Sequence, residues 1–290
     1  MELWLVYAIL GSIFAGVNTI LAKIGIKGVN SHLATAVRTF VIVIFSWVIV
    51  FSVGSHVELG GVGGRTWIFL IASGLATGAS WLCFFYALKF GTVSNVSPLK
   101  KSSTVLTIIL AFLILGEPVG LPQLAGMAFI IAGTVFMLDK NEGSQEKDKG
   151  RSHWLLLAVL AAVFASLVTI FGAIGIADVD ADLGNAIRVV VVLVASWGFV
   201  LFTGSQKGIK EISKKSWVFL ALSGLATGSS WLFFFRALQI GPVSAIVPID
   251  KLSIIFNILF ACIFLGEKQS LKRIAGLGCL VVGTLVLVMM

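Results

Sequence analysis

Residues 67–88, WIFLIASGLATGASWLCFFYAL, return at positions 217–238 as WVFLALSGLATGSSWLFFFRAL. The match continues without a gap, so that residues 67–138 align with 217–288 at a constant offset of 150. Of these 72 aligned pairs 32 are identical, far more than two unrelated apolar helices would share. The chain therefore contains an internal repeat, and the fold of one half predicts the fold of the other.

The composition of the 290 residues points to a membrane protein. Hydrophobic residues make up 58% of the chain and charged residues only 12%, and the mean hydropathy is +1.06. Soluble domains are about 45–50% apolar and about 25% charged, so this chain has too few charges to cover a water-facing surface. The net charge of +8 would suit a nucleic-acid-binding protein. The basic residues lie mostly in short connecting segments, however, where they act as topology signals, and no binding of nucleic acid is expected.

The chain contains ten stretches that are long and apolar enough to cross a bilayer, for which about 20 residues are needed. The predicted spans are 4–26, 33–53, 67–89, 95–115, 119–138, 154–176, 183–203, 217–239, 245–265 and 271–289. The sequence thus predicts an all-α integral membrane protein with ten transmembrane helices, a multi-pass protein of the plasma (inner) membrane.

The repeat and the spans together predict the domain organisation. The clearly hydrophilic stretch at 139–153, DKNEGSQEKDKGRSH, is a linker between a first five-helix repeat, 1–138, and a second, 154–290. Because each repeat holds an odd number of spans, the second enters the membrane in the opposite orientation to the first. Such inverted-topology repeats are related by a pseudo-two-fold axis in the membrane plane, as in many secondary transporters.

Three motifs occur once in each half: GLATG followed by S-W in the third helix, V-S-x-x-x-P at the entry of the fourth, and LGE before a glycine-rich fifth helix. In these motifs the halves resemble the EamA-type domains of the drug/metabolite transporter (DMT) superfamily, in particular its small five-helix bacterial and archaeal members, here fused in tandem. The resemblance covers essentially the whole chain. It implies ten helices around a central cavity and the transport of a small metabolite or drug-like solute, without specifying which one.

Pro98 and Pro248 mark the fourth helix of each half. A proline breaks or kinks a helix and frees carbonyl groups. Matched breaks in two inverted repeats are typical of a binding site near the bilayer midplane. The alternative is that each proline simply begins its helix at the membrane interface.

Four charged residues follow these prolines: Lys100 and Lys101 in the first half, and Asp250 and Lys251 in the second. A charge near the bilayer centre costs at least about 2.5–3.5 kcal/mol, so it needs a partner or water. We interpret the four as a substrate and coupling site facing a cavity, in which Asp250 pairs with Lys100, its counterpart, or with Lys251. The alternative is that all four lie at headgroup level, where lysine side chains extend to lipid.

Two arginines and two tryptophans at equivalent positions of the halves complete the candidate site. Arg38 and Arg188, several residues into the second helix of each half, could clamp a carboxylate or phosphate, cap carbonyl groups or anchor to headgroups. Trp81 and Trp231 lie on the same helix face as the glycines of GLATG, which allow close helix packing. These indoles could line the cavity and hold a cation, or belong to an interfacial belt.

Glu117 and Glu267 occupy the LGE turns between the fourth and fifth helices of each half. A carboxylate in this position is expected to cap the next helix or to pair at the membrane interface. No catalytic role is expected of either residue.

The sequence contains no Ser-His-Asp grouping, HExxH motif, phosphate-binding glycine loop or metal-spaced His/Cys cluster, so no enzyme activity, cofactor or metal is expected. We predict a secondary active transporter that moves a small solute by alternating access and is proton-coupled through Asp250. The alternative is a non-transporting membrane partner such as a lipid-carrier flippase subunit. The expected partners are a small-molecule substrate and the lipid bilayer, and a monomer or a homodimer is expected.

Overall fold

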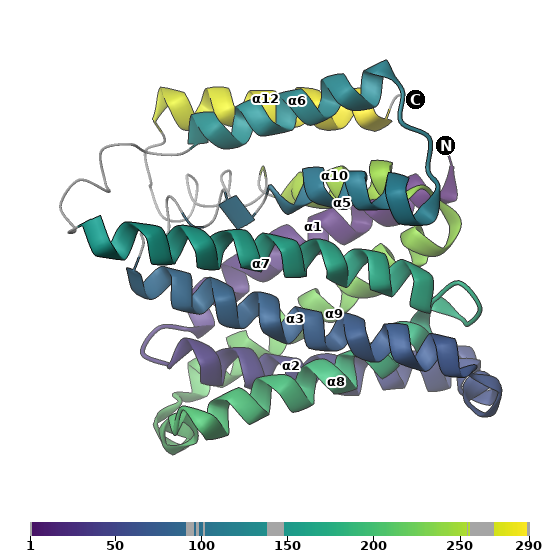
Figure 1. The fold of residues 1–290 in the computed structure, drawn as a ribbon. Coiled ribbons are helices and arrows are strands. Elements are labelled where there is room, and N and C mark those ends of the chain that lie inside the picture. The colour runs from purple at the N-terminus through teal and green to yellow at the C-terminus, as the bar shows by residue number, and fades with distance from the viewer. Residues whose placement is uncertain are drawn as a thin grey trace. The chain divides into compact units, whose positions relative to one another are not determined.

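Every regular element in the described part of the chain is a helix, as the hydropathy pattern predicts. The computed structural model describes residues 2–90, 96, 99–100, 102–137, 148–253, 255 and 270–288. The elements of the first half are α1 Leu3–Gly25, α2 Ser31–Val53, the 3-10 helix η1 Ser55–Gly61, α3 Gly64–Phe90, α5 Ser103–Leu110, the π-helical turn η2 Ala111–Leu115 and α6 Leu121–Met137. Those of the second half are α7 Asp148–Gly175, α8 Ala181–Phe202, the 3-10 helix η3 Ser205–Glu211, α9 Lys214–Ile240, α10 Val243–Lys251 and α12 Leu271–Val288 (Figure 1).

The ends of the helices are set by local signals that recur in both halves. The side chain of Asn30 caps α2 by accepting hydrogen bonds from two backbone N–H groups, and Asp180 caps α8 in the same way at the equivalent position. Gly54 follows α2 with φ 89°, and Gly204 lies just beyond α8 with φ 69°. Glycine adopts this left-handed conformation at little cost, so the same residue type stops the equivalent helix in each half.

In the described part of the chain, six helices are long and apolar enough to cross a membrane: α1, α2, α3, α7, α8 and α9. The segments Ser103–Leu115, Leu121–Phe136 and Ile274–Val288 are apolar but shorter. Parts of the predicted fourth and ninth spans, 95–115 and 245–265, lie outside the described residues. The all-helical fold is therefore confirmed for the described chain, whereas the count of ten transmembrane helices stays a prediction.

The predicted linker, 139–153, is described only in its second part. Residues 138–147 lie outside the described chain, and α7 begins at Asp148, ahead of the apolar span predicted from residue 154. The boundaries of the two repeats stay a prediction.

The long helices expose apolar faces. On α2 the side chains of Phe40, Ile44, Val48 and Phe51 are between 51% and 60% exposed, whereas Val50 is fully buried. The four exposed residues recur at intervals of three or four and so share one face of the helix. A water-soluble surface rarely carries an apolar stripe of this length, so this face is suited to contact with lipid.

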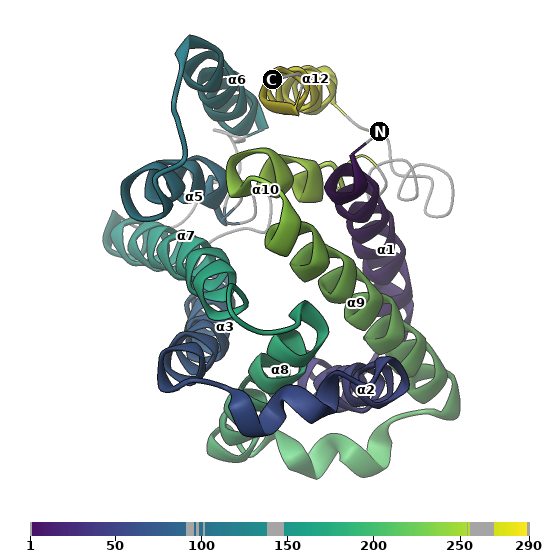
Figure 2. The ribbon, with the colours of Figure 1, turned by 90° about the vertical axis from the view of Figure 1, so that its right-hand side faces the viewer.

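The chain forms two compact units, and each contains helices from both halves. The first unit comprises residues 1–75, 171–241 and 253–266. Within it α1 lies along α9, and α2 packs against both α8 and α9 (Figure 2). Its apolar core joins these helices through buried residues that include Val37 and Leu220.

The second unit comprises residues 76–170, 242–252 and 267–290. Within it α6 and α12, the fifth helices of the two halves, lie side by side, and α10 contacts α5 and α12 (Figure 1). A hydrogen bond from Ser80 Oγ to the carbonyl oxygen of Ala161, 2.9 Å long, joins α3 to α7 in this unit.

Glycines allow α6 and α12 to touch. A Cβ atom on Gly126 would lie 3.0 Å from the carbonyl oxygen of Gly283, and one on Gly133 would lie 2.6 Å from that of Gly276. The earlier glycine of each helix thus meets the later glycine of the other, which makes the two helices antiparallel. Gly126 and Gly276 are equivalent in the repeat, as are Gly133 and Gly283, so the contact is the same from either side.

Candidate functional site

Close packing of helices from opposite halves positions both arginines in the first unit. A Cβ atom on Gly74 of α3 would lie 3.0 Å from the carbonyl oxygen of Arg188 in α8. Its equivalent on Gly224 of α9 would lie 3.0 Å from the carbonyl oxygen of Arg38 in α2. The close packing predicted from GLATG is therefore present at both positions, and it brings each arginine-bearing helix against the third helix of the other half.

One face of α9 carries the side chains that meet both arginines. Ser223, Thr227, Trp231 and Phe235 follow at intervals of four residues, so they form a row along the helix with about 6 Å between neighbours. Ser223, Thr227 and Phe235 are buried, and Trp231 is half-buried. The first part of this row is polar and the second is aromatic.

Arg38 meets the polar part of the row. Its Nη2 donates to Asn18 Oδ1 of α1 at 2.6 Å and to Thr227 Oγ1 at 2.8 Å. Ser223 Oγ donates to the same Asn18 oxygen at 2.7 Å. The guanidinium group therefore ties α1, α2 and α9 together through neutral acceptors.

Arg188 meets the aromatic part of the row. Its Cζ lies 4.6 Å from the ring centroid of Trp231 and 4.6 Å from that of Phe235. Cation–π contacts of this kind stabilise a guanidinium group most when water is excluded, and the residue is only 1% exposed. Such burial rules out a headgroup anchor for Arg188 and places its charge inside the first unit.

An ion pair joins α8 to α9 further along the same helix. Arg236 donates through Nε to Asp182 Oδ1 at 2.8 Å and through Nη2 to Asp182 Oδ2 at 2.5 Å. Asp182 is the second residue of α8 and only 4% exposed. This two-pronged geometry is the strongest that a guanidinium and a carboxylate can form.

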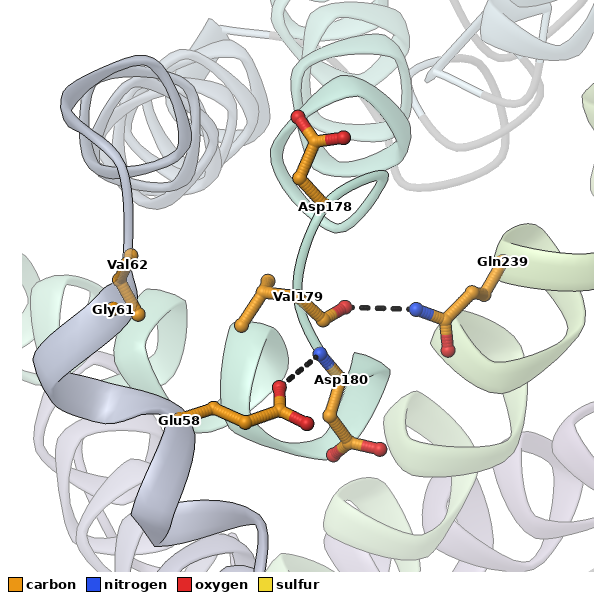
Figure 3. Close-up of a pocket in the computed structure, with 7 residues that line it drawn as sticks. All are labelled: Glu58, Gly61, Val62, Asp178, Val179, Asp180 and Gln239. Carbon is orange, nitrogen blue, oxygen red and sulfur yellow. Dashed lines mark hydrogen bonds between the residues drawn. The ribbon is translucent and has the colours of Figure 1, made fainter.

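An open pocket of about 420 Å³ lies at this end of the first unit (Figure 3). It is lined by Glu58, Gly61, Val62, Asp178, Val179, Asp180 and Gln239. Its polar groups are largely bound to backbone: the Glu58 carboxylate accepts from the Asp180 N–H at 3.0 Å, and Gln239 Nε2 donates to the Val179 carbonyl at 2.8 Å. These contacts fix the connection between α7 and α8, which identifies the pocket as a structural junction.

In the second unit, α10 carries the predicted charge pair. Lys251 Nζ donates to Asp250 Oδ2 at 2.8 Å, and the side chains are 33% and 23% exposed, respectively. Lys100 Nζ lies 4.5 Å from the ring centroid of Phe84. Of the two partners predicted for Asp250, the structure therefore brings together Asp250 and Lys251, while Lys100 faces an aromatic ring.

The other predicted site residues lie as follows. Pro248 is buried inside α10, and the helix ends three residues later, at Lys251. Trp81 is a half-buried residue of α3 in the second unit. Pro98 and Lys101 lie outside the described residues.

The turn after η2 holds a contact that sequence alone left open. Glu117 accepts from the Val243 N–H through Oε1 at 2.6 Å and from the Ser244 N–H through Oε2 at 2.9 Å. The carboxylate therefore caps α10 of the other half, and not the next helix in the chain. Glu267, its equivalent, lies outside the described residues.

Comparison with known proteins agrees with this architecture. The model of the EamA-like transporter family matches residues 2–139 and, a second time, 152–289. The chain belongs to the EamA-like transporter family. The resemblance carried by the repeated motifs is thereby confirmed, and with it the prediction of a multi-pass membrane transporter that acts on a small molecule.

Relatives of this EamA-like transporter include a protein the length of one repeat and proteins longer than this chain. A Sinorhizobium protein named an uncharacterized transporter is 42% identical over 134 residues, which are 46% of this chain and 95% of that protein. An uncharacterized transporter of Methanothermobacter thermautotrophicus is 24% identical over 71% of this chain and 60% of its own length. Human solute carrier family 35 member G1 is 25% identical over 77% of this chain and 62% of its own length. The chain thus spans about three fifths of the latter two, whereas the Sinorhizobium protein corresponds to one repeat.

A crystal structure of another protein has the same fold as this EamA-like chain. It superposes with a TM-score of 0.75 over 97% of this chain and 94% of its own, at 15% sequence identity. At this identity the likeness shows the fold alone.

Sequence reasoning missed three partners in the site. Asn18 and Thr227, which hold Arg38, are ordinary polar residues of apolar helices, and only the fold brings them together. Arg236 replaces a tyrosine at the equivalent position, Tyr86, and it arises in the half that also gains Asp182. This paired gain of opposite charges was the available signal for the ion pair.

Proposed function

We propose that this protein is a proton-coupled secondary active transporter that moves a small solute by alternating access between two inverted five-helix repeats, 1–138 and 154–290, joined by the linker 139–153. Membership of a transporter family supports this function over that of a non-transporting partner. The geometry that would carry transport is the inverted repeat, and the coupling residue is Asp250.

The observation that carries the alternating-access part is the antiparallel contact of α6 and α12. These are equivalent helices of the two halves, yet Gly126 meets Gly283 while Gly133 meets Gly276. Helices that occupy equivalent positions in the two halves and run in opposite directions support an inverted repeat. In such an arrangement each half can adopt the conformation of the other, which converts an opening on one side of the membrane into an opening on the other.

The contacts of the arginine helices support the same symmetry. Gly74 packs on α8 and Gly224 packs on α2, with equal distances to the carbonyl oxygens of Arg188 and Arg38. Each half therefore depends on the other for the packing of its third helix. Two equivalent interfaces of this kind can exchange roles during a transport cycle.

The coupling part rests on Asp250 and Lys251 in α10. A carboxylate that is held by an ammonium group keeps its charge, whereas one that loses this partner inside the membrane is favoured to take up a proton. Lys251 holds Asp250 in this structure at 2.8 Å. Release of Asp250 in the alternate state, with Lys100 as a second candidate partner, would link proton uptake to the change of access.

The experiment compares Asp250→Asn with wild type in reconstituted vesicles, with a solute chosen by a thermal-shift screen, since a ligand that binds the native state raises its melting temperature. We expect Asp250→Asn to abolish uptake driven by a pH gradient and to retain solute binding and passive exchange. Asp178→Asn, which neutralises an exposed carboxylate in the α7–α8 connection, is the matched control and should behave as wild type. Concentrative uptake by Asp250→Asn under a pH gradient would refute the coupling role.

A further inference from the structure

We propose that Arg38 and Arg188 together bind the acidic group, a carboxylate or a phosphate, of the solute that the protein transports. This inference rests on the proposed transport function and adds the charge class of its substrate. It is carried by the arrangement of the two guanidinium groups along α9.

The charge of Arg38 is balanced only by neutral groups in the described part of the chain. Its partners are an amide oxygen of Asn18 and a hydroxyl of Thr227, whereas the carboxylates of Asp182 and Asp250 are held by Arg236 and Lys251. The buried Nε–H of Arg38 donates to no acceptor in that part of the chain. A cation within a membrane-spanning helix is costly unless a counter-charge or water accompanies it, and a transported anion would supply that counter-charge.

The position of Arg188 doubles the positive charge at one place on α9. Arg38 bonds Thr227, and Arg188 stacks on Trp231, one helical turn further along the same row. Contact with the rings of Trp231 and Phe235 holds the Arg188 guanidinium group beside this row. A guanidinium group donates its hydrogen bonds in its own plane, in a fork that matches carboxylate and phosphate oxygens.

A cationic solute does not fit this row. The aromatic ring that could hold it, Trp231, already faces the guanidinium group of Arg188. The nearest acidic residue along α8, Asp182, is engaged by two hydrogen bonds from Arg236. A cation would therefore meet the like charge of Arg38, whereas an anion would meet an opposite one.

The row also explains how the site stays assembled. Ser223 and Arg38 both donate to the side-chain oxygen of Asn18, so hydrogen bonds to a neutral acceptor hold α1, α2 and α9 together. Arg38 is half-buried, which leaves part of its side chain accessible. The preorganised donor is therefore present before an anion arrives.

The test is a thermal-shift and calorimetric screen of the purified full-length protein against several hundred small metabolites, sorted into anions, cations and neutral compounds. Inorganic phosphate and succinate represent the anions, choline and putrescine the cations, and glucose the neutral compounds. We expect the stabilising compounds to carry a carboxylate or a phosphate. Arg38→Gln should raise the Kd of such a compound by about 10- to 150-fold, the usual loss for a hydrogen bond to a charged group.

Two further variants keep the result interpretable. Arg38→Lys retains the charge and loses the fork, so it should bind anions with intermediate affinity even if Arg38→Gln folds poorly. Arg65→Gln removes an exposed arginine at the start of α3 and should leave Kd unchanged. Anion affinity that is equal in Arg38→Gln and Arg65→Gln would overturn the proposal, and so would a screen in which only cations or neutral compounds stabilise the protein.

The transport assay separates this proposal from the proposed function. Proton-driven uptake of a cation that requires Asp250 would leave the transport mechanism standing and overturn the anion site. Arg38-dependent binding of an anion without proton-driven uptake would support the anion site and overturn the coupling.

Discussion

Replacing Glu117 by alanine is expected to destabilise α10 by about 1–3 kcal/mol. The carboxylate satisfies two of the backbone N–H groups that a helix leaves unpaired at its start, those of Val243 and Ser244, at 2.6 and 2.9 Å. Loss of a capping side chain costs about 0.5–2 kcal/mol. Loss of a negative charge beside the helix N-terminus adds about 0.3–1 kcal/mol. Added together, these two losses give about 1–3 kcal/mol.

Hydrogen exchange measured by mass spectrometry gives the local readout. Opening of the first turn of α10 should become easier, so the amides of Val243 and Ser244 should exchange roughly 5- to 150-fold faster in Glu117→Ala. Glu117→Gln keeps one neutral acceptor oxygen, so its exchange rate at these amides should lie between those of wild type and Glu117→Ala. The melting temperature of the whole protein should decrease by about 2–8 °C, on the usual scaling for chains of this size.

The control is Glu211→Ala, which removes an exposed carboxylate at the end of η3. This variant should melt as wild type does and leave exchange in α10 unchanged. Unchanged exchange at the start of α10 in Glu117→Ala would refute the capping role. Slower transport with normal exchange would likewise show that the residue acts elsewhere.

Three other perturbations are predicted from single contacts. Asp182→Asn leaves the guanidinium group of Arg236 without its ion partner, and we expect the free energy of unfolding to decrease by about 1–3 kcal/mol. Adding Arg236→Gln should cause no further decrease, which a double-mutant cycle would measure. Gly133→Leu forces a side chain against a backbone oxygen of α12 that would lie only 2.6 Å from Cβ, so little folded protein should be recovered by size-exclusion chromatography. Gly278→Ala is the control: a Cβ atom there has nothing within 4 Å, so the yield of folded protein should not change. Asp180→Ala removes the cap of α8 and should cost about 0.5–2 kcal/mol, measured as a lower melting temperature.

The helices and the repeat could be predicted because their signals are local. Span 33–53 was inferred from hydropathy alone and corresponds to α2, Ser31–Val53. The start of this helix depends on the side chain of Asn30, a neighbour in sequence. The apolar length of a span and the residues that cap its ends lie within a few residues of the helix that they determine. The helices can therefore be predicted from the neighbouring sequence.

The partners of the charged residues could not be predicted in the same way. The sequence offered Lys100 and Lys251 as partners for Asp250, and the structure pairs it with Lys251. Glu117 was expected to cap the next helix or to pair at the membrane interface, whereas its carboxylate binds N–H groups 126 and 127 residues further along the chain. Such contacts depend on which helices become neighbours, and hydropathy carries no information about that choice.

The internal repeat keeps some of its charged positions and changes others. Arg38 and Arg188 are equal in the two halves and meet one row of α9, so under the proposed mechanism the same group of a solute can be held from either half. Lys100 and Asp250 occupy equivalent positions but carry opposite charges. A ligand, the proton included, shifts an equilibrium only by its differential affinity for the two states. Under the proposed coupling, the two access states differ in their proton affinity at Asp250. The single carboxylate in α10 would then be the place where the proton acts, while the shared arginines would keep the solute site common to both states.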